Sequence, residues 1–281
     1  MTTFALIRPW LETLGGLVLA GAACVVGRLF SRLRRPYWAA GYAAPLLVIA
    51  AVAAVRWAPA LEFIPPFSWL LAGRIEFAAS AAAGAMLFAT LLPHLPRREM
   101  KILVGILMAV IVLRYAVLPF ALPGLLRGSL SALETKFDPD GVCQQSTGYT
   151  CGPAAAVSAL DQLGLPGDEA ELAVLARTNP VSGTQPDLLC AALAERYAAR
   201  GLSCEYRYFA SVAELRDAAP AIAMIRHSIL TDHYVAVLKV DDLRVTLADP
   251  QVGLRKLSDE HFARIWRNCA IVLSLPGAGP E

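Results

Sequence analysis

The sequence predicts an all-α transmembrane region followed by a globular α+β domain. Four long apolar runs follow one another within the first 120 residues, and hydrophobic residues make up 57% of the chain, more than an ordinary soluble enzyme contains. Residues 1–119 hold eleven Lys/Arg and four Asp/Glu, whereas residues 120–281 hold fourteen and nineteen. Because the basic half is also the apolar half, its charge is typical of membrane-flanking loops rather than of a nucleic-acid-binding surface.

The apolar runs predict four transmembrane helices, near residues 13–30, 37–55, 77–92 and 102–120. A spanning helix needs about 20 residues to cross a hydrocarbon core of roughly 30 Å, so the first and third runs are short and three spans are the alternative. Buried helices of a soluble protein are the competing interpretation, which four runs in tandem disfavour. The first run also resembles a secretory signal, but the arginines after it and the three further runs favour an uncleaved anchor.

Basic residues in the short loops predict the orientation of these helices. Four arginines follow the first run, and Arg97, Arg98 and Lys101 follow the third. The positive-inside rule places both loops in the cytoplasm, so the N-terminus and everything after the fourth helix lie outside. With only three spans the second half would lie in the cytoplasm instead. Arg114 interrupts the fourth run and either faces the bundle interior or marks an incompletely inserted helix.

The second half of the chain has the patterns of an α+β domain. Residues 121–141 are expected to form a linker, residues 142–275 the domain and residues 276–281 a tail. Helices are expected near 152–163, 168–177, 186–200, 212–218 and 258–267. Strands are expected near 205–209, 221–225, 233–240, 244–248 and 270–275. Helices that come first, followed by largely consecutive strands, are typical of an α+β fold rather than a doubly wound parallel sheet.

Cys151 stands at the start of the first of these helices. Pro153 fits the first turn, where a missing N–H costs nothing, and Gly164 is suited to end the helix. The unpaired N–H groups and the helix dipole at this end favour a thiolate, which is the nucleophilic form of cysteine. The alternative is that Cys151 is one more small buried side chain.

A catalytic thiolate needs a base, a group that orients the base, and a donor for the oxyanion. His233 begins one buried strand and Asp249 ends the next, so an imidazole and a carboxylate are expected at one edge of the sheet. His227 also follows an apolar run and is the rival base. Gln145 offers a neutral amide a short loop before the thiol. Taken singly, a histidine at a strand start and an Asp-Pro turn are ordinary features.

Together these residues resemble the peptidase C39 family, the papain-like peptidase domains of bacteriocin-processing ABC transporters. The resemblance covers about residues 142–275, and its motifs are Gln145 six residues before Cys151, Cys-Gly-Pro opening a helix, Asp-His-Tyr-Val-Ala-Val-Leu around His233, and Ala-Asp-Pro at Asp249. It implies a papain-like fold with Cys151 as nucleophile and His233 as general base and then acid. It also implies that Asp249 orients the imidazole and that Gln145 is the oxyanion donor.

The resemblance further implies a peptide substrate that is cleaved after a pair of small residues, typically the Gly-Gly end of a leader. The expected partners are this peptide, the lipid bilayer and a separate export transporter, in the bacterial inner membrane. Family members of the transporter type carry a membrane domain and an ATPase after a cytoplasmic peptidase. Here the membrane region comes first, and the chain has no Gly-x4-Gly-Lys-Ser/Thr nucleotide loop.

Three alternatives to this interpretation remain open. The same thioester intermediate would serve a transglutaminase-type acyltransferase, and the same fold would serve as a leader-binding module without catalysis. No cofactor, metal or nucleic acid is expected, since the six cysteines include no Cys-x-x-Cys pair. The cysteines outside the motif are expected to be buried small residues, although Cys143 would suit a bridge, with no partner assigned, in an oxidising compartment: Cys143, Cys190, Cys204 and Cys269.

Overall fold

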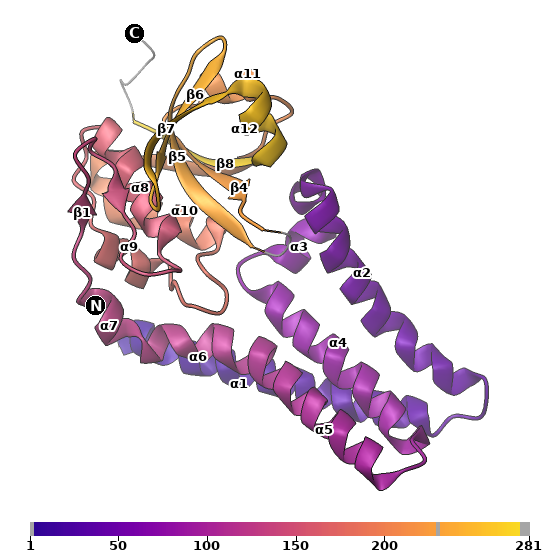
Figure 1. The fold of residues 1–281 in the computed structure, drawn as a ribbon. Helices are drawn as coiled ribbons and strands as arrows, with labels where there is room; N and C mark the ends of the chain where they lie inside the picture. Colours follow the sequence, from indigo (N-terminus) through magenta and orange to yellow (C-terminus); the bar gives the residue numbers. More distant parts are fainter. Residues whose placement is uncertain (1–2, 229–230, 276–281) are drawn as a thin grey trace. The chain divides into compact units, whose positions relative to one another are not determined.

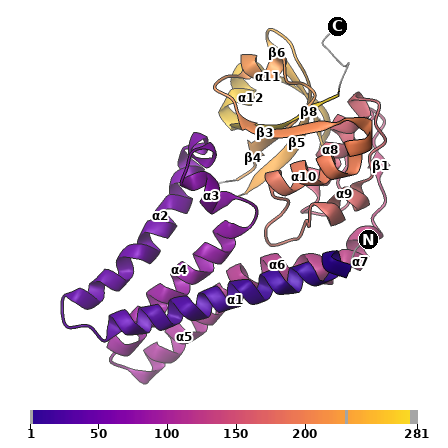
Figure 2. The same cartoon turned by 180° about the vertical axis from the view of Figure 1, so that it is seen from behind.

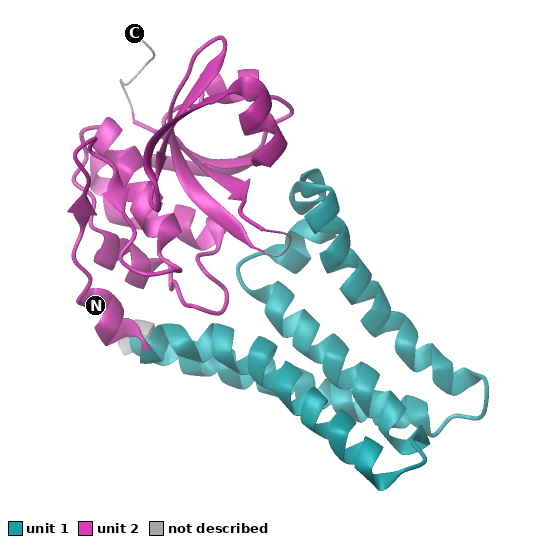
Figure 3. Cartoon of the chain, viewed as in Figure 1, with its two compact units in different colours: residues 1–125 teal, residues 126–281 magenta. Residues whose placement is uncertain are grey.

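The structure is a computed structural model that describes residues 3–228 and 231–275. The expected tail, residues 276–281, lies outside the described residues. The chain forms two compact units, residues 1–125 and residues 126–281 (Figure 3). Each unit has its own interior.

The first unit is entirely helical, as the sequence predicts. Four helical stretches are long and apolar enough to cross a membrane: Leu6–Ser31, Tyr37–Trp57, Ile75–His94 and Arg98–Leu125. They comprise 26, 21, 20 and 28 residues, so the first and third exceed the lengths expected from their uncharged runs. The first begins earlier because Arg8 and Glu12 lie one helical turn apart and pair at 2.8 Å, which allows both charges to remain on the helix.

These stretches are built from long helices joined by short turns (Figures 1 and 2). The long helices are α1 (Thr3–Ser31), α2 (Ala43–Trp57), α4 (Ile75–Leu91), α5 (Arg98–Val112) and α6 (Leu118–Leu125). The short ones are η1 (Tyr37–Tyr42), η2 (Pro59–Phe63), α3 (Phe67–Leu71) and η3 (Leu92–His94). A π-helical turn, η4 (Leu113–Val117), connects α5 to α6 and contains Arg114, whose guanidinium lies 5.4 Å from the centre of the Tyr115 ring.

Small residues allow α1 and α4 to approach each other closely. A Cβ atom on Gly27 would lie 2.5 Å from the carbonyl oxygen of Met86, so only glycine fits there. The Thr90 hydroxyl lies at the same contact and donates to the carbonyl oxygens of Met86, at 2.8 Å, and Gly27, at 3.3 Å. Close approach of backbones at small residues, with a hydroxyl between them, is a usual way for helices to associate inside a membrane.

Folded secondary structure occupies much of the range that was expected to be a linker, residues 121–141. The fourth apolar stretch continues to Leu125, and the second unit starts with α7 (Arg127–Ser131). Strand β1 (Lys136–Phe137) then pairs with β2 (Cys143–Gln144) across a turn that the Asp138 carboxylate holds by accepting the N–H groups of Asp140 and Val142. The strands have only two residues each, which is too short for an alternating pattern to be seen in the sequence.

The second unit is an α+β fold. Its first helices are α8 (Cys151–Gln162), α9 (Glu169–Leu175) and α10 (Pro186–Tyr197), and α10 is followed by the turn η5 (Ala198–Arg200). The strands of the large sheet are β3 (Ser203–Tyr208), β4 (Ala221–Arg226), β5 (Asp232–Val240), β6 (Arg244–Asp249), β7 (Gly253–Ser258) and β8 (Trp266–Ser274). They are antiparallel in the order β3-β8-β4-β5-β6-β7, and two further helices, α11 (Val212–Arg216) and α12 (Asp259–Ile265), lie in the connections.

Two hydrophobic clusters cover the two faces of this sheet. Alternate residues of β5 show the division, because Tyr234 and Ala236 pack with helices α8 to α10, whereas Val235 and Val237 pack with the cluster of Phe262 and Trp266. The helices and most strands lie within a few residues of the positions expected from the sequence. Strand β8 starts at Trp266 rather than near residue 270, because a register shift against β4 and a positive φ of 58° at Asn268 interrupt its regular pattern.

Candidate active site

Cys151 is the first residue of α8, and this helix is buried along most of its length. The helix tolerates burial because its inward residues are small, and Ala154, Ala155 and Ala156 are fully enclosed. Gly152 is required by close packing, since a Cβ atom there would lie 3.0 Å from the Cβ of Thr184. Cys151 itself is partly exposed, so its thiol lies at the edge of the core rather than inside it.

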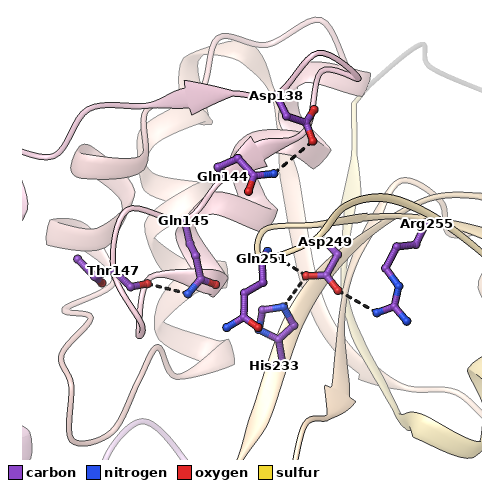
Figure 4. Close-up of polar contacts among 8 residues, drawn as sticks. All are labelled: Asp138, Gln144, Gln145, Thr147, His233, Asp249, Gln251 and Arg255. Carbon is purple, nitrogen blue, oxygen red and sulfur yellow. Dashed lines mark hydrogen bonds and ion pairs between the residues drawn. The ribbon is translucent and has the colours of Figure 1, made fainter.

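His233 and Asp249 come from neighbouring antiparallel strands, at the start of β5 and the end of β6. The imidazole Nε2 and the carboxylate Oδ1 are 2.9 Å apart, and the two residues are 4% and 2% exposed (Figure 4). The Cys151 thiol makes a hydrogen bond to the same imidazole. Because Nε2 faces Asp249, Nδ1 is the ring nitrogen left for the thiol. The structure therefore brings together three of the four residues named from the sequence.

Charge in this group is controlled by its hydrogen bonds. Burial disfavours the imidazolium and lowers the pKa of His233, but the bonds to Asp249 and Cys151 outweigh burial and raise that pKa to about 9. Burial also raises the pKa of Asp249, but bonds from His233, from the Gln251 N–H and from Arg255 lower it to about 2. At neutral pH the pair is an imidazolium beside a carboxylate.

Arg255 is a member of the site that the sequence analysis did not identify. Its Nη1 lies 3.0 Å from Asp249 Oδ2, while the Gln251 N–H donates to Oδ1 at 3.0 Å (Figure 4). Arg255 belongs to β7, which pairs with β6 so that Asp249 faces Gly253. Its signal in the sequence was a basic residue two positions beyond that glycine, but it has meaning only once β7 is known to be a strand.

Gln145 lies on the loop between β2 and α8 and contacts the sheet through its backbone. Its N–H donates to the carbonyl oxygen of Pro250 at 3.0 Å, directly after Asp249. The side-chain Nε2 donates one of its two hydrogens to the Thr147 carbonyl oxygen at 2.7 Å (Figure 4). Its buried Oε1 has no hydrogen-bond partner within the described residues. Gln145 thus has a fixed position next to the histidine and aspartate, with one N–H left for a ligand.

Glu169 holds the loop that carries Gln145, and the sequence analysis missed it. The residue is fully buried, and its carboxylate accepts the Ser146 N–H at 2.9 Å and the Ser146 hydroxyl at 2.6 Å. Its own N–H donates to Thr135 Oγ1 at 2.9 Å. In the sequence Glu169 is one of several acidic residues at a helix start, which is ordinarily an exposed position, so only the structure distinguishes it from Glu171.

His227, the rival base, does not replace His233. Its imidazole is exposed and its ring centre lies 5.8 Å from that of His233. In residues 3–228 and 231–275 it is His233 that bonds Asp249. Nor does this part of the chain contain a group of three or more His, Cys, Asp or Glu placed to hold a metal ion.

An α+β unit with a cysteine at the start of a buried helix, next to a histidine on the sheet, defines the class of papain-like cysteine peptidase folds. Residues 140–276 match the model of the peptidase C39 family, and the chain belongs to this family. An uncharacterized protein of Methanothermobacter marburgensis is 38% identical over 132 residues, which cover 47% of this chain and 87% of the relative. One from Methanothermobacter thermautotrophicus is 33% identical over 144 residues, covering 51% and 95%.

Solved structures with a similar fold include two peptidase domains of transporters. The peptidase domain of Streptococcus ComA, a bifunctional ABC transporter involved in quorum sensing, is 24% identical with a TM-score of 0.42, over 47% of this chain and 96% of that one. A double glycine motif protease from an AMS/PCAT transporter, solved in complex with the leader peptide, is 19% identical with a TM-score of 0.39, over 52% and 96%.

The raised pKa of His233 predicts that stability falls in alkaline solution. Between the ordinary value of 6.5 and the folded value of about 9, the folded chain binds one more proton than the unfolded chain. This contribution is complete below the lower value and is lost as the pH rises through the upper one, by about 1.4 kcal/mol per pH unit. Asp249→Asn, which removes the carboxylate, is expected to flatten this slope in thermal unfolding of the full chain in detergent.

The matched control is Asp241→Asn, because Asp241 is an exposed carboxylate that pairs with Lys239 at 2.6 Å on the surface. This variant is expected to retain the alkaline slope of the unaltered chain. Equal slopes in all three proteins would show that the interaction between His233 and Asp249 does not raise the pKa of the imidazole.

The buried carboxylate of Glu169 predicts a local effect on the loop before α8. Glu169→Gln leaves the Ser146 N–H or hydroxyl without a proper acceptor, which costs about 1–3 kcal/mol. Hydrogen exchange is expected to become faster in peptides covering residues 144–150. Glu171→Gln is the control, since Glu171 forms an exposed pair with Arg196 at 2.7 Å, and such pairs contribute about 0–1 kcal/mol. Equal exchange in both variants would contradict a role for Glu169 in holding this loop.

Proposed function

We propose that this chain is a membrane-anchored cysteine peptidase that cleaves peptides after a pair of small residues, such as the Gly-Gly end of a leader. The observation that carries the proposal is the hydrogen-bonded series of Cys151, His233 and Asp249 at the start of a buried helix. Membership of the peptidase C39 family supports the same reaction class. The double glycine motif protease and its leader peptide supply the model for the substrate.

In the proposed reaction Cys151 attacks the carbonyl carbon of the scissile peptide bond as a thiolate. The imidazolium of His233 then gives its proton to the leaving amine, and the neutral imidazole later takes a proton from the water that hydrolyses the thioester. Asp249 keeps Nε2 occupied, so Nδ1 faces the thiol throughout. The pKa of about 9 suits the acid step, because the imidazolium is populated at neutral pH.

The negative charge on the carbonyl oxygen needs preorganised donors. We assign this role to Gln145 Nε2, which has one hydrogen not used by Thr147, together with N–H groups at the start of α8. The hydrogen bond of the Gln145 backbone to Pro250 and the bonds of Glu169 to Ser146 fix the position of this amide before a substrate arrives.

The proposed location is the bacterial inner membrane, with the peptidase unit on the extracytoplasmic side. Four spanning stretches place both ends of the membrane region on one side, and the basic loops after the first and third stretches place that side outside. The expected partners are the peptide substrate, the lipid bilayer and a separate export transporter, because the chain has no nucleotide loop of its own.

The direct test is peptide cleavage by the full chain in detergent under reducing conditions, with peptides that carry Gly-Gly or Gly-Ala after a helical leader. Cleavage after the small pair is expected, and Cys151→Ala is expected to abolish it while peptide binding remains. Masses of the products distinguish the alternatives: addition of an amine instead of water would indicate acyl transfer, and tight binding without any product would indicate a binding module. Full turnover by Cys151→Ala would refute the assignment of the nucleophile.

The role of Gln145 can be separated from that of its neighbour. Gln145→Ala is expected to lower kcat by about 10²–10³-fold with little change in KM, because an oxyanion donor acts mainly in the transition state. Gln144→Ala is the matched control, since the Gln144 amide donates instead to Asp138 Oδ2 at 3.2 Å, and its kcat is expected to stay close to that of the unaltered chain. Equal kcat values for the two variants would remove Gln145 from the catalytic residues.

A further inference from the structure

A second pair of reactive side chains lies outside the site of Cys151. Cys190 belongs to α10 and Cys204 to β3, and their thiol groups make a hydrogen bond to each other. Helix α10 packs beside β3 in the second unit (Figure 2). Both cysteines are partly exposed and pack against the same hydrophobic cluster. The helix and the strand therefore place two free thiols side by side at the rim of the core.

The two thiols have different electrostatic environments. The hydrogen bond from Cys204 stabilises the thiolate of Cys190 and lowers the pKa of Cys190. The same bond raises the pKa of Cys204, and burial raises it further. Cys190 is thus the thiol that reacts first with an electrophilic sulfur, and Cys204 is held next to it as the proton donor.

Other cysteines of the unit have less suitable surroundings for oxidation. Cys143 is fully enclosed, and burial together with the nearby Glu169 carboxylate raises the pKa of its thiol to about 12. Cys269 is 1% exposed, and Cys151 makes its hydrogen bond to His233. Among the described residues of the unit, the pair of Cys190 and Cys204 is the one in which two thiols contact each other.

We propose that Cys190 and Cys204 form an intramolecular disulfide, which joins α10 to the edge strand β3, when the chain meets a low-molecular-weight disulfide. The Cys190 thiolate attacks one sulfur of the small disulfide, forms a mixed disulfide and releases the first small thiolate. Cys204 then loses its proton to solvent and attacks the Cys190 sulfur, and the second small thiolate leaves. Two protein thiols are oxidised, and one small disulfide is reduced to two thiols.

The bond would secure a part of the sheet that has few backbone partners. Strand β3 is at the edge of the sheet and pairs only with β8 within the described residues. Side chains of α10 cover its inner face, and Leu193 and Tyr197 continue the helical stripe that starts at Cys190. A covalent link at the start of this stripe restrains helix and edge strand together. The inference does not depend on peptidase activity, since no residue of the candidate active site takes part.

The test is a cysteine map of the purified full chain in detergent. The reduced protein is incubated with glutathione disulfide, remaining thiols are alkylated, and the digested peptides are identified by mass. The expected product is a pair of peptides joined through Cys190 and Cys204 that has lost two hydrogens, carries no glutathione and separates on reduction. The midpoint of thermal unfolding is expected to rise by roughly 5–10 °C on oxidation, because a loop of this length is closed.

Single-serine variants test the order of the two steps. Cys204→Ser is expected to trap glutathione on Cys190, whereas Cys190→Ser is expected to leave Cys204 free for alkylation. Neither variant gains thermal stability on oxidation. Cys269→Ser is the control and retains the link. The proposal is overturned if Cys190 and Cys204 both remain alkylated after Cys151 has been converted completely to its glutathione adduct, or if either is joined to another cysteine. This mapping in the unaltered chain decides the question even if a variant fails to fold.

Discussion

The buried hydrogen bond between His233 and Asp249 is the interaction on which the geometry of the candidate site depends. A carboxylate with almost no exposure is stable only when its oxygens are satisfied, and Asp249 receives bonds from β5, from the turn after β6 and from β7. Each donor is delivered by the antiparallel pairing of three consecutive strands. The orientation of the imidazole therefore follows from the register of the sheet.

The thiol and the amide come from the helical side of the unit, so the two halves of the site need a fixed junction. That junction is short: the Gln145 N–H bonds the carbonyl oxygen of Pro250, one residue beyond Asp249. Glu169 secures the same loop from the opposite direction through Ser146. A buried charge is a costly way to hold a loop unless it is fully hydrogen-bonded, and it makes loop position sensitive to loss of a single oxygen. This arrangement suits a loop that must present a donor within a few tenths of an ångström.

Much of the fold could be predicted because its determinants are local. Uncharged runs identified the four apolar helices, and strand alternation placed His233 and Asp249 at neighbouring strand ends. Arg255 and Glu169 could not be found in this way, since the first lies on a short edge strand with charged residues and the second in an acidic helix start. Their roles depend on which side of an element faces the core, and that is decided by packing between segments distant in sequence. The pair of Cys190 and Cys204 escaped prediction for the same reason.

The five cysteines of the second unit show how one side chain acquires different chemistry from its surroundings. Cys143 and Cys269 are enclosed by apolar neighbours, where a thiolate is unfavourable. Cys151 is placed at a helix start beside an imidazole, a setting for attack on carbonyl carbon. Cys190 and Cys204 have each other as partners, a setting for exchange with sulfur. Thiol chemistry thus requires no separate domain for each task, because burial, a helix end and one neighbouring group suffice to divide it.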